Sequence, residues 1–101
     1  MEITNERWTE AELHRVRGKL LVAVGALASA EDNFHKAVAV AQRQNAKLWE
    51  LRASLDLARL WRDQGKRREA RDLLAPIYGW FTEGFDTPVL QDAKALLDEL
   101  A

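Results

Sequence analysis

The sequence has no cysteine and only two prolines among its 101 residues. Without cysteine, the chain forms neither disulfides nor thiolate metal sites. No stretch is rich in proline, glycine or serine, so no linker divides the chain, and we expect one small domain over 1–101. The longest apolar run, 20–28, is interrupted by Gly25 and is far shorter than a membrane span. The positively charged segment that usually begins a signal peptide does not precede that run. The sequence therefore predicts a cytoplasmic protein without membrane contact.

Neither sign of charge dominates, because 15 Lys and Arg residues are balanced by 16 Asp and Glu residues, for a net charge of −1. This balance gives no global attraction to nucleic acid or to anionic lipid. The segment 62–71 is locally basic, but Asp63, Glu69 and the adjoining Asp72 dilute its charge. Contact with nucleic acid through 62–71 is therefore a remote alternative.

Side chains that carry catalysis or bind metals are also sparse. His14 and His35 are not at a metal-ligand spacing, and Ser29 and Ser54 have no adjacent base in the sequence. No glycine-rich phosphate loop is present. The sequence therefore predicts no catalytic, cofactor-binding or metal site, and a protein that is not an enzyme.

Apolar residues at helical spacing predict a first helix from Thr9, which forms a capping box with Glu12. The stripe of this helix consists of Leu13, Val16, Leu20, Val24 and Leu27. Ser29 predicts the N-cap of a second helix that runs to about Asn45.

Three further helices follow. The third begins around Lys47 and is closed by Gly65 as a left-handed C-cap, and the fourth begins near Arg67 and contains Pro76, which should kink it. Residues 82–86 are expected to form a loop in which Phe85 fills the gap between the last two helices. Asp86 or Thr87 caps the last helix, which has Pro88 in its first turn. Five helices and no strand result, which makes the expected fold all-α.

Residues of matching character recur forty positions apart, which indicates two copies of one helical-hairpin unit. The matching pairs are Gly18 and Ala58, Leu21 and Trp61, Gly25 and Gly65, Ala30 and Ala70, Phe34 and Leu74, and Ala37 and Ile77. In this register both copies resemble the tetratricopeptide repeat, whose pattern is W-x2-L-G-x2-Y followed by A-x3-F. The second copy matches better, because the first has His14 for the aromatic residue and Arg17 for the leucine. The period of 40 also exceeds the family's period of about 34.

The resemblance implies an alpha-alpha superhelix made of two antiparallel helix pairs and a C-terminal capping helix. Repeat 1 would span about 9–46, repeat 2 about 47–82 and the capping helix about 87–100. The segments 10–15, 48–53, 78–88 and 93–97 also look like the carboxyl-terminal repeats of large bacterial signalling proteins. These proteins carry a predicted ATPase module that is often joined to a class III nucleotide cyclase or a DNA-binding output domain. None of the ATPase or cyclase motifs is present here. The resemblance therefore implies only protein interaction and regulation within a larger assembly.

In the tetratricopeptide family the concave groove is lined by the first helix of each pair. The positions that correspond to it here are Glu12, Arg15, Lys19, Val22, Ala23, Arg52, Leu55, Arg59, Arg62 and Asp63. The resemblance implies that Arg15, Lys19, Arg52, Leu55, Arg59 and Arg62 bind a partner, a protein or peptide that bears carboxylates. The alternative is that these cations form a solvated face and pair with Glu50, Asp56 and Asp63 along the helices.

Two repeats are fewer than the three that such arrays normally need. The last helix can cap one end with polar residues, but nothing before Trp8 caps the other end. We therefore expect the face of the first two helices to be completed by preceding repeats or by a second copy of the chain, as a homodimer. Trp8 and Trp80 either anchor a partner or cover an end of the bundle.

Overall fold

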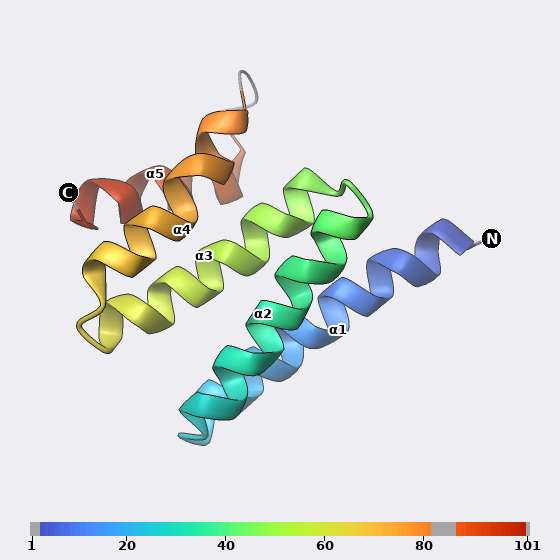
Figure 1. The fold of residues 1–101 in the computed structure, drawn as a ribbon, viewed down its shortest axis with the longest axis horizontal. Coiled ribbons are helices and arrows are strands. Elements are labelled where there is room, and N and C mark those ends of the chain that lie inside the picture. The colour runs from blue at the N-terminus through green and yellow to red at the C-terminus, as the bar shows by residue number, and fades with distance from the viewer. Residues whose placement is uncertain (1–2, 82–86, 101) are drawn as a thin grey trace.

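The computed structural model describes residues 3–81 and 87–100, with side chains from residue 10 onward, and these residues form five α-helices and no strand (Figure 1). The helices are α1 (Ile3–Ala23), α2 (Leu27–Arg43), α3 (Lys47–Asp63), α4 (Arg67–Trp80) and α5 (Pro88–Leu100). The prediction of an all-α fold is therefore confirmed. No described helix combines the length and the apolar character that a membrane span requires.

Each of the first three turns contains one residue in the left-handed backbone conformation. Gly25, Asn45 and Gly65 have positive φ values of 84°, 55° and 82°. Glycine adopts this left-handed conformation without a steric cost, and asparagine tolerates it better than most residues. In each turn the next amide donates to a carbonyl five residues back, as Lys66 does to Trp61 at 2.8 Å, which satisfies an end of the preceding helix. The predicted left-handed C-cap at Gly65 is confirmed.

Two predicted helix starts are wrong. Helix α1 begins at Ile3, so Thr9 lies inside the helix and is not its N-cap. Helix α2 begins at Leu27 after Ala26, which makes no side-chain cap hydrogen bond, and the carbonyl of Ser29 inside the helix accepts a bond from Asn33 Nδ2. The tight turn at residue 25 returns the chain to helical geometry without a polar cap, so Ser29 does not act as the N-cap of α2.

The later boundaries agree with the sequence patterns. Helix α3 begins at Lys47, α4 begins at Arg67 and contains Pro76, and α5 begins at Pro88. The amide of Gln91 donates to the carbonyl of Thr87 at 3.0 Å, which places Thr87 just before the first turn of α5. The expected loop at 82–86 and its Phe85 lie outside the described residues.

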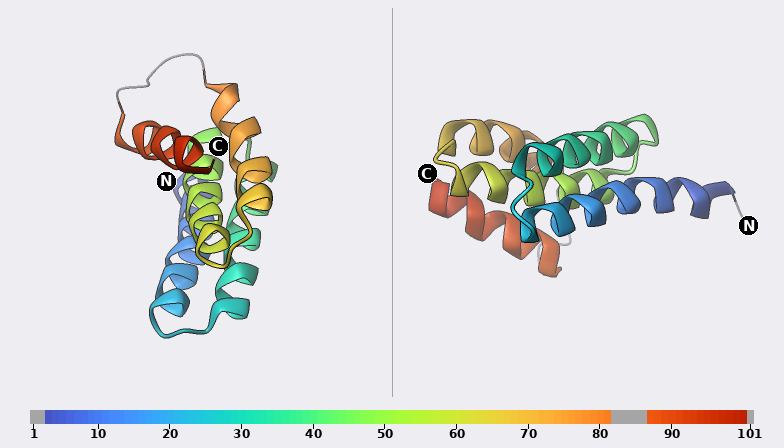
Figure 2. Two further views of the ribbon diagram at one scale, coloured as in Figure 1. Left: turned by 90° about the vertical axis from the view of Figure 1, so that its left-hand side faces the viewer. Right: turned by 90° about the horizontal axis from the view of Figure 1, so that it is seen from below.

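Each helix packs against the next one in the chain, and the odd-numbered helices also lie side by side, α1 against α3 and α3 against α5. Helices α1 and α5 therefore stand at opposite ends of the arrangement, and the N-terminal part of α1 projects past the other helices (Figures 1 and 2). The radius of gyration is 13.2 Å. A compact domain of this length has a value of about 13 Å.

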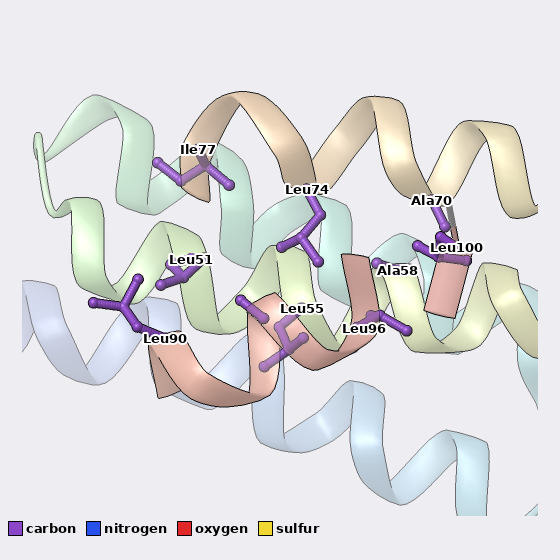
Figure 3. Packing of buried hydrophobic residues seen from close by; sticks show 10 residues of the cluster. Leu51, Leu55, Ala58, Ala70, Leu74, Ile77, Leu90, Leu96 and Leu100 are labelled. Carbon is purple, nitrogen blue, oxygen red and sulfur yellow. The ribbon is translucent and has the colours of Figure 1, made fainter. Parts of the chain in front are cut away.

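The central helix is α3, which packs against all the others and is apolar on several sides. Its largest cluster joins α3, α4 and α5, and Figure 3 shows Leu51 of α3 between Ile77 of α4 and Leu90 of α5. A second cluster packs Ala30 and Phe34 of α2 against Leu57 and Leu60 of α3. The core is thus continuous from α2 to α5, and α1 is attached at its edge.

Candidate functional site

A cleft of about 380 Å³ lies between α1, α3 and α5. It is lined by Arg15, Lys19, Leu48, Arg52, Leu55, Asp56, Arg59, Pro88, Val89 and Asp92. Five of the six predicted partner-binding residues thus come together, because α1 and α3 lie side by side with these positions facing the same opening. The sixth, Arg62, is not part of this cleft.

Arg62 instead joins α3 to the end of α5. Its guanidinium lies 3.1 Å from a carboxylate oxygen of Asp63 and 3.1 Å from one of Glu99. The hydrogen bond to Asp63 raises the pKa of Arg62, with a smaller contribution from Glu99. Arg67 of the basic segment 62–71 also donates to the backbone carbonyl of Glu99. These two cations of the segment are engaged within the chain.

Carboxylates neutralise two of the four cations that line the cleft. Arg15 donates to both oxygens of Glu12, at 2.6 and 2.9 Å, and to Asp56 of α3 at 2.9 Å. The bond from Arg15 is the largest effect on Glu12 and lowers its pKa, against the opposing effect of burial. Arg59 lies 3.5 Å from Asp56 and 3.6 Å from Asp92. These contacts hold α1, α3 and α5 together across the cleft.

The two other cations of the cleft are Lys19 and Arg52, and no carboxylate among the described side chains reaches ion-pairing distance of either one. The guanidinium of Arg52 lies over the ring of Trp49, 4.9 Å from its centroid. Leu55 is only 3% exposed and belongs to the core, so it offers little surface to a partner. Carboxylates of the same chain therefore neutralise part of the positive charge that lines the cleft.

The ion pairs that the alternative of a solvated helix face expects are present for some residues only. Asp56 and Asp63 pair with arginines of their own helix, as that interpretation requires. Glu50 instead contacts Lys47 at 3.7 Å and accepts a hydrogen bond from Gln42 of α2. Of the remaining groove positions, Val22 and Asp63 line a smaller hollow of about 190 Å³ beside the cleft, and Ala23 is exposed.

Sequence reasoning missed the link between Arg15 and Asp56, which are 41 residues apart. Asp56 was expected to pair only along its own helix. The forty-residue register of the sequence contains a signal for this link, because it aligns Asp56 with position 16, next to Arg15. Side-by-side packing of equivalent helices brings such neighbouring positions together.

A second surface feature is the outer face of α1, defined here as Leu13, Val16, Arg17 and Leu20. Helix α1 faces α2 with small residues: Ala11 is buried, and the ring of Phe34 covers Gly18 so closely that an added Cβ would lie 2.5 Å from it. The apolar stripe lies on the opposite side. Leu13, Val16 and Leu20 are 44%, 43% and 63% exposed.

Exposed large hydrophobic residues are concentrated around this face. Those among the described residues are Leu13, Val16, Leu20, Val22, Val24, Leu27, Leu48 and Trp80. Six of the eight lie between 13 and 27, in α1, in the turn after it and at the first position of α2. A monomeric surface carries scattered apolar residues, but a contiguous group indicates an interaction surface.

The tryptophans add little to this surface. Trp80 is 57% exposed and has Lys47 5.7 Å from its ring centroid, whereas Trp61 is partly buried and donates to Glu31 at 3.1 Å. The side chain of Trp8 lies outside the described residues.

No group of His, Cys, Asp and Glu within the described part of the chain has the arrangement to hold a metal ion. Comparisons with protein-family models, with curated proteins and with solved structures found no match to this chain.

Proposed function

We propose that this chain is a non-catalytic protein-interaction module whose principal binding surface is the outer face of α1. The observation that carries this proposal is the concentration of exposed aliphatic side chains there, with Leu20 63% exposed. Burial of apolar area is the main driving force of protein association. Helix α1 lies at one end of the stack (Figure 1), and the residues of its outer face are exposed there.

The proposed architecture is a pair of tetratricopeptide-like hairpins with α5 as the capping helix. It is supported by the contacts between α1, α3 and α5, and by left-handed glycines at the equivalent positions Gly25 and Gly65. It is also supported by complete burial of the equivalent residues Ala30 and Ala70. In such an array each hairpin buries its apolar face against a neighbour, so an end without one is a docking surface. A regulatory role in a larger bacterial assembly rests on the sequence resemblance.

The cleft is a weaker candidate for the main binding surface. Arg15 and Arg59 are already paired with Glu12, Asp56 and Asp92, and a peptide carboxylate would have to compete with these contacts. Of the four cations that line the cleft, an acidic peptide would find only Lys19 and Arg52 without an ion pair to a described side chain. We therefore assign the cleft an accessory role.

Site-specific photocrosslinking in the cells that produce the protein tests the proposal. A benzophenone amino acid replaces Leu20 on the outer face or, as a matched control, the exposed Lys94 on α5. We expect a discrete protein adduct from position 20 that is missing from position 94. The adduct protein, once purified, should bind the unmodified chain and lose this binding with Leu20→Asp. Absence of an adduct at position 20, or identical adducts at both positions, would contradict the proposal.

A further inference from the structure

The forty-residue repeat aligns the outer face of α1 with a surface of α3 that another helix of the chain covers. Forty residues after Leu13, Arg17 and Leu20 stand Ala53, Leu57 and Leu60 of α3. These three residues of α3 are only 1%, 0% and 5% exposed. Helix α2 covers them. The outer face of α1 is thus the equivalent of a surface that this same chain covers with a helix.

The contacts of α2 on α3 define the geometry of that cover. Phe34 packs in one cluster with Leu57 and Leu60, and Val38 packs with Ala53. One turn earlier, Glu31 accepts the indole hydrogen bond of Trp61. Three positions of α2, spaced i, i+3 and i+7, therefore span the covered surface of α3.

The two surfaces differ most at one position. Arg17 stands where α3 has Leu57, the fully buried centre of the contact. Among the described side chains Arg17 has no ion-pair partner, and it is exposed in the single chain. A helix that covered α1 as α2 covers α3 would bury this guanidinium. Burying an unpaired charge is costly, so the covering helix must supply a carboxylate at its central position.

We infer that the outer face of α1 binds an amphipathic helix of another polypeptide, which lies on α1 as α2 lies on α3 and directs a carboxylate to Arg17. The partner helix carries aliphatic residues at the positions that correspond to Glu31 and Val38. In α2 these positions contact Trp61 and Ala53, whose equivalents in α1 are Leu21, next to Leu20, and Leu13. This inference rests on the proposed function and specifies the partner. The carboxylate also provides selectivity, because a helix without it leaves Arg17 buried and unpaired.

A second copy of the chain fits this surface poorly. The outer face consists of three aliphatic residues and Arg17, and it contains no acidic residue. A two-fold contact between two such faces brings both Arg17 side chains into the same interface, where like charges oppose association. The charge of the face therefore favours a different, acidic partner over a homodimer.

Two synthetic helices with bridged side chains on their solvent side test the inference. Both have the sequence of 27–43 with Glu31→Leu, and they differ only at position 34, where one has Phe34→Glu and the other the isosteric, uncharged Phe34→Gln. We expect the acidic helix to bind the full chain about tenfold or more tightly than the neutral helix, as a charged hydrogen bond of 1.4 kcal/mol or more requires. Amide chemical-shift changes should centre on Leu13, Arg17 and Leu20.

Charge reversal of the chain provides the matched control. Arg17→Glu should remove the preference for the acidic helix, whereas Arg68→Glu changes net charge equally at an exposed position of α4 and should preserve it. Equal affinity of both helices for the unmodified chain would overturn the inference but leave the proposed function standing. Amide chemical-shift changes centred on Leu57 would mean that the synthetic helix displaces α2, and would also overturn the inference. Dimerisation of the chain that Leu20→Asp abolishes would overturn the inference as well. Failure of both helices to bind would count against the proposed binding face as well.

Discussion

At the scale of single residues, Gly18 and Phe34 decide how closely α1 approaches α2. Phe34 is 1% exposed and packs between Gly18 of α1 and Leu57 of α3. The repeat pairs Gly18 with Ala58, and this pairing correctly indicated a small residue at a close contact. The sequence could not show that the first pair of helices needs glycine itself.

Gly18→Ala should therefore destabilise the protein. Its Cβ would lie 2.5 Å from Phe34 Cε1, which is an overlap, and overpacking of this kind costs about 1–3 kcal/mol. Gly79→Ala is the matched control, because a Cβ there meets nothing within 4 Å and alanine is the better helix former by about 0.5–1 kcal/mol. Urea unfolding should thus give changes of opposite sign, and equal effects would disprove the tight contact.

The carboxylate of Glu12 provides a pH-dependent contribution to stability. Hydrogen bonds from Arg15 hold its pKa below the ordinary value of 4.5. Because the folded form binds the proton less readily than the unfolded chain, this contribution is complete above pH 4.5 and is lost as the pH falls through the lowered pKa. Glu12→Gln should flatten the acid limb of the stability curve, measured by urea unfolding from pH 6 to 3. Asp72→Asn, which removes an exposed carboxylate of α4, should retain the wild-type limb, and an unchanged limb in Glu12→Gln would contradict the assignment.

At the scale of elements, the turns were more predictable than the helix starts. A glycine that follows an apolar helical pattern usually adopts the left-handed conformation that ends a helix, so Gly65 correctly predicted the end of α3. A capping box is weaker, because Thr9 and Glu12 also fit inside a longer helix, and α1 continues back to Ile3. The candidate site was predictable only as a set of helix positions. Ion pairs between helices, such as Arg15 with Asp56, follow from the forty-residue register only when side-by-side packing of α1 and α3 is also known.

The ion pair between Arg15 and Asp56 links α1 to α3, and both side chains are largely buried. A double-mutant cycle with Arg15→Met and Asp56→Asn should give a coupling energy of about 0.5–3 kcal/mol, because the two side chains belong to one ion-pair network in which Arg15 also pairs with Glu12 and Asp56 with Arg59. The same cycle on the exposed Lys94 and Asp98 should give a much smaller coupling. Equal coupling in the two cycles would show that the Arg15 pair does not attach α1 to α3.

At the scale of the whole molecule, the two ends of the helical stack differ. Helix α5 covers the last hairpin with buried Leu90, Leu96 and Leu100, and none of its residues is among the exposed large hydrophobics. Helix α1 directs its aliphatic stripe away from the rest of the protein. Apolar periodicity correctly predicted the stripe, but periodicity alone does not show which side of a helix its neighbours occupy. The asymmetry allows a partner to bind at one end while the other end is closed.

The same leucine-to-alanine change at equivalent positions tests this asymmetry. Leu60→Ala removes a side chain that is 5% exposed and packs with Phe34 and Leu57, so it should lower the unfolding free energy by about 2–5 kcal/mol. Leu20→Ala removes the equivalent side chain of α1, which is 63% exposed, and should change the unfolding free energy by less than about 0.5 kcal/mol. Urea unfolding of both variants at several protein concentrations measures the two effects. A large, concentration-dependent loss in Leu20→Ala would mean that the outer face is already buried between copies of the chain. A concentration-independent effect below the stated limit would mean that this face contributes little to folding and is free to bind.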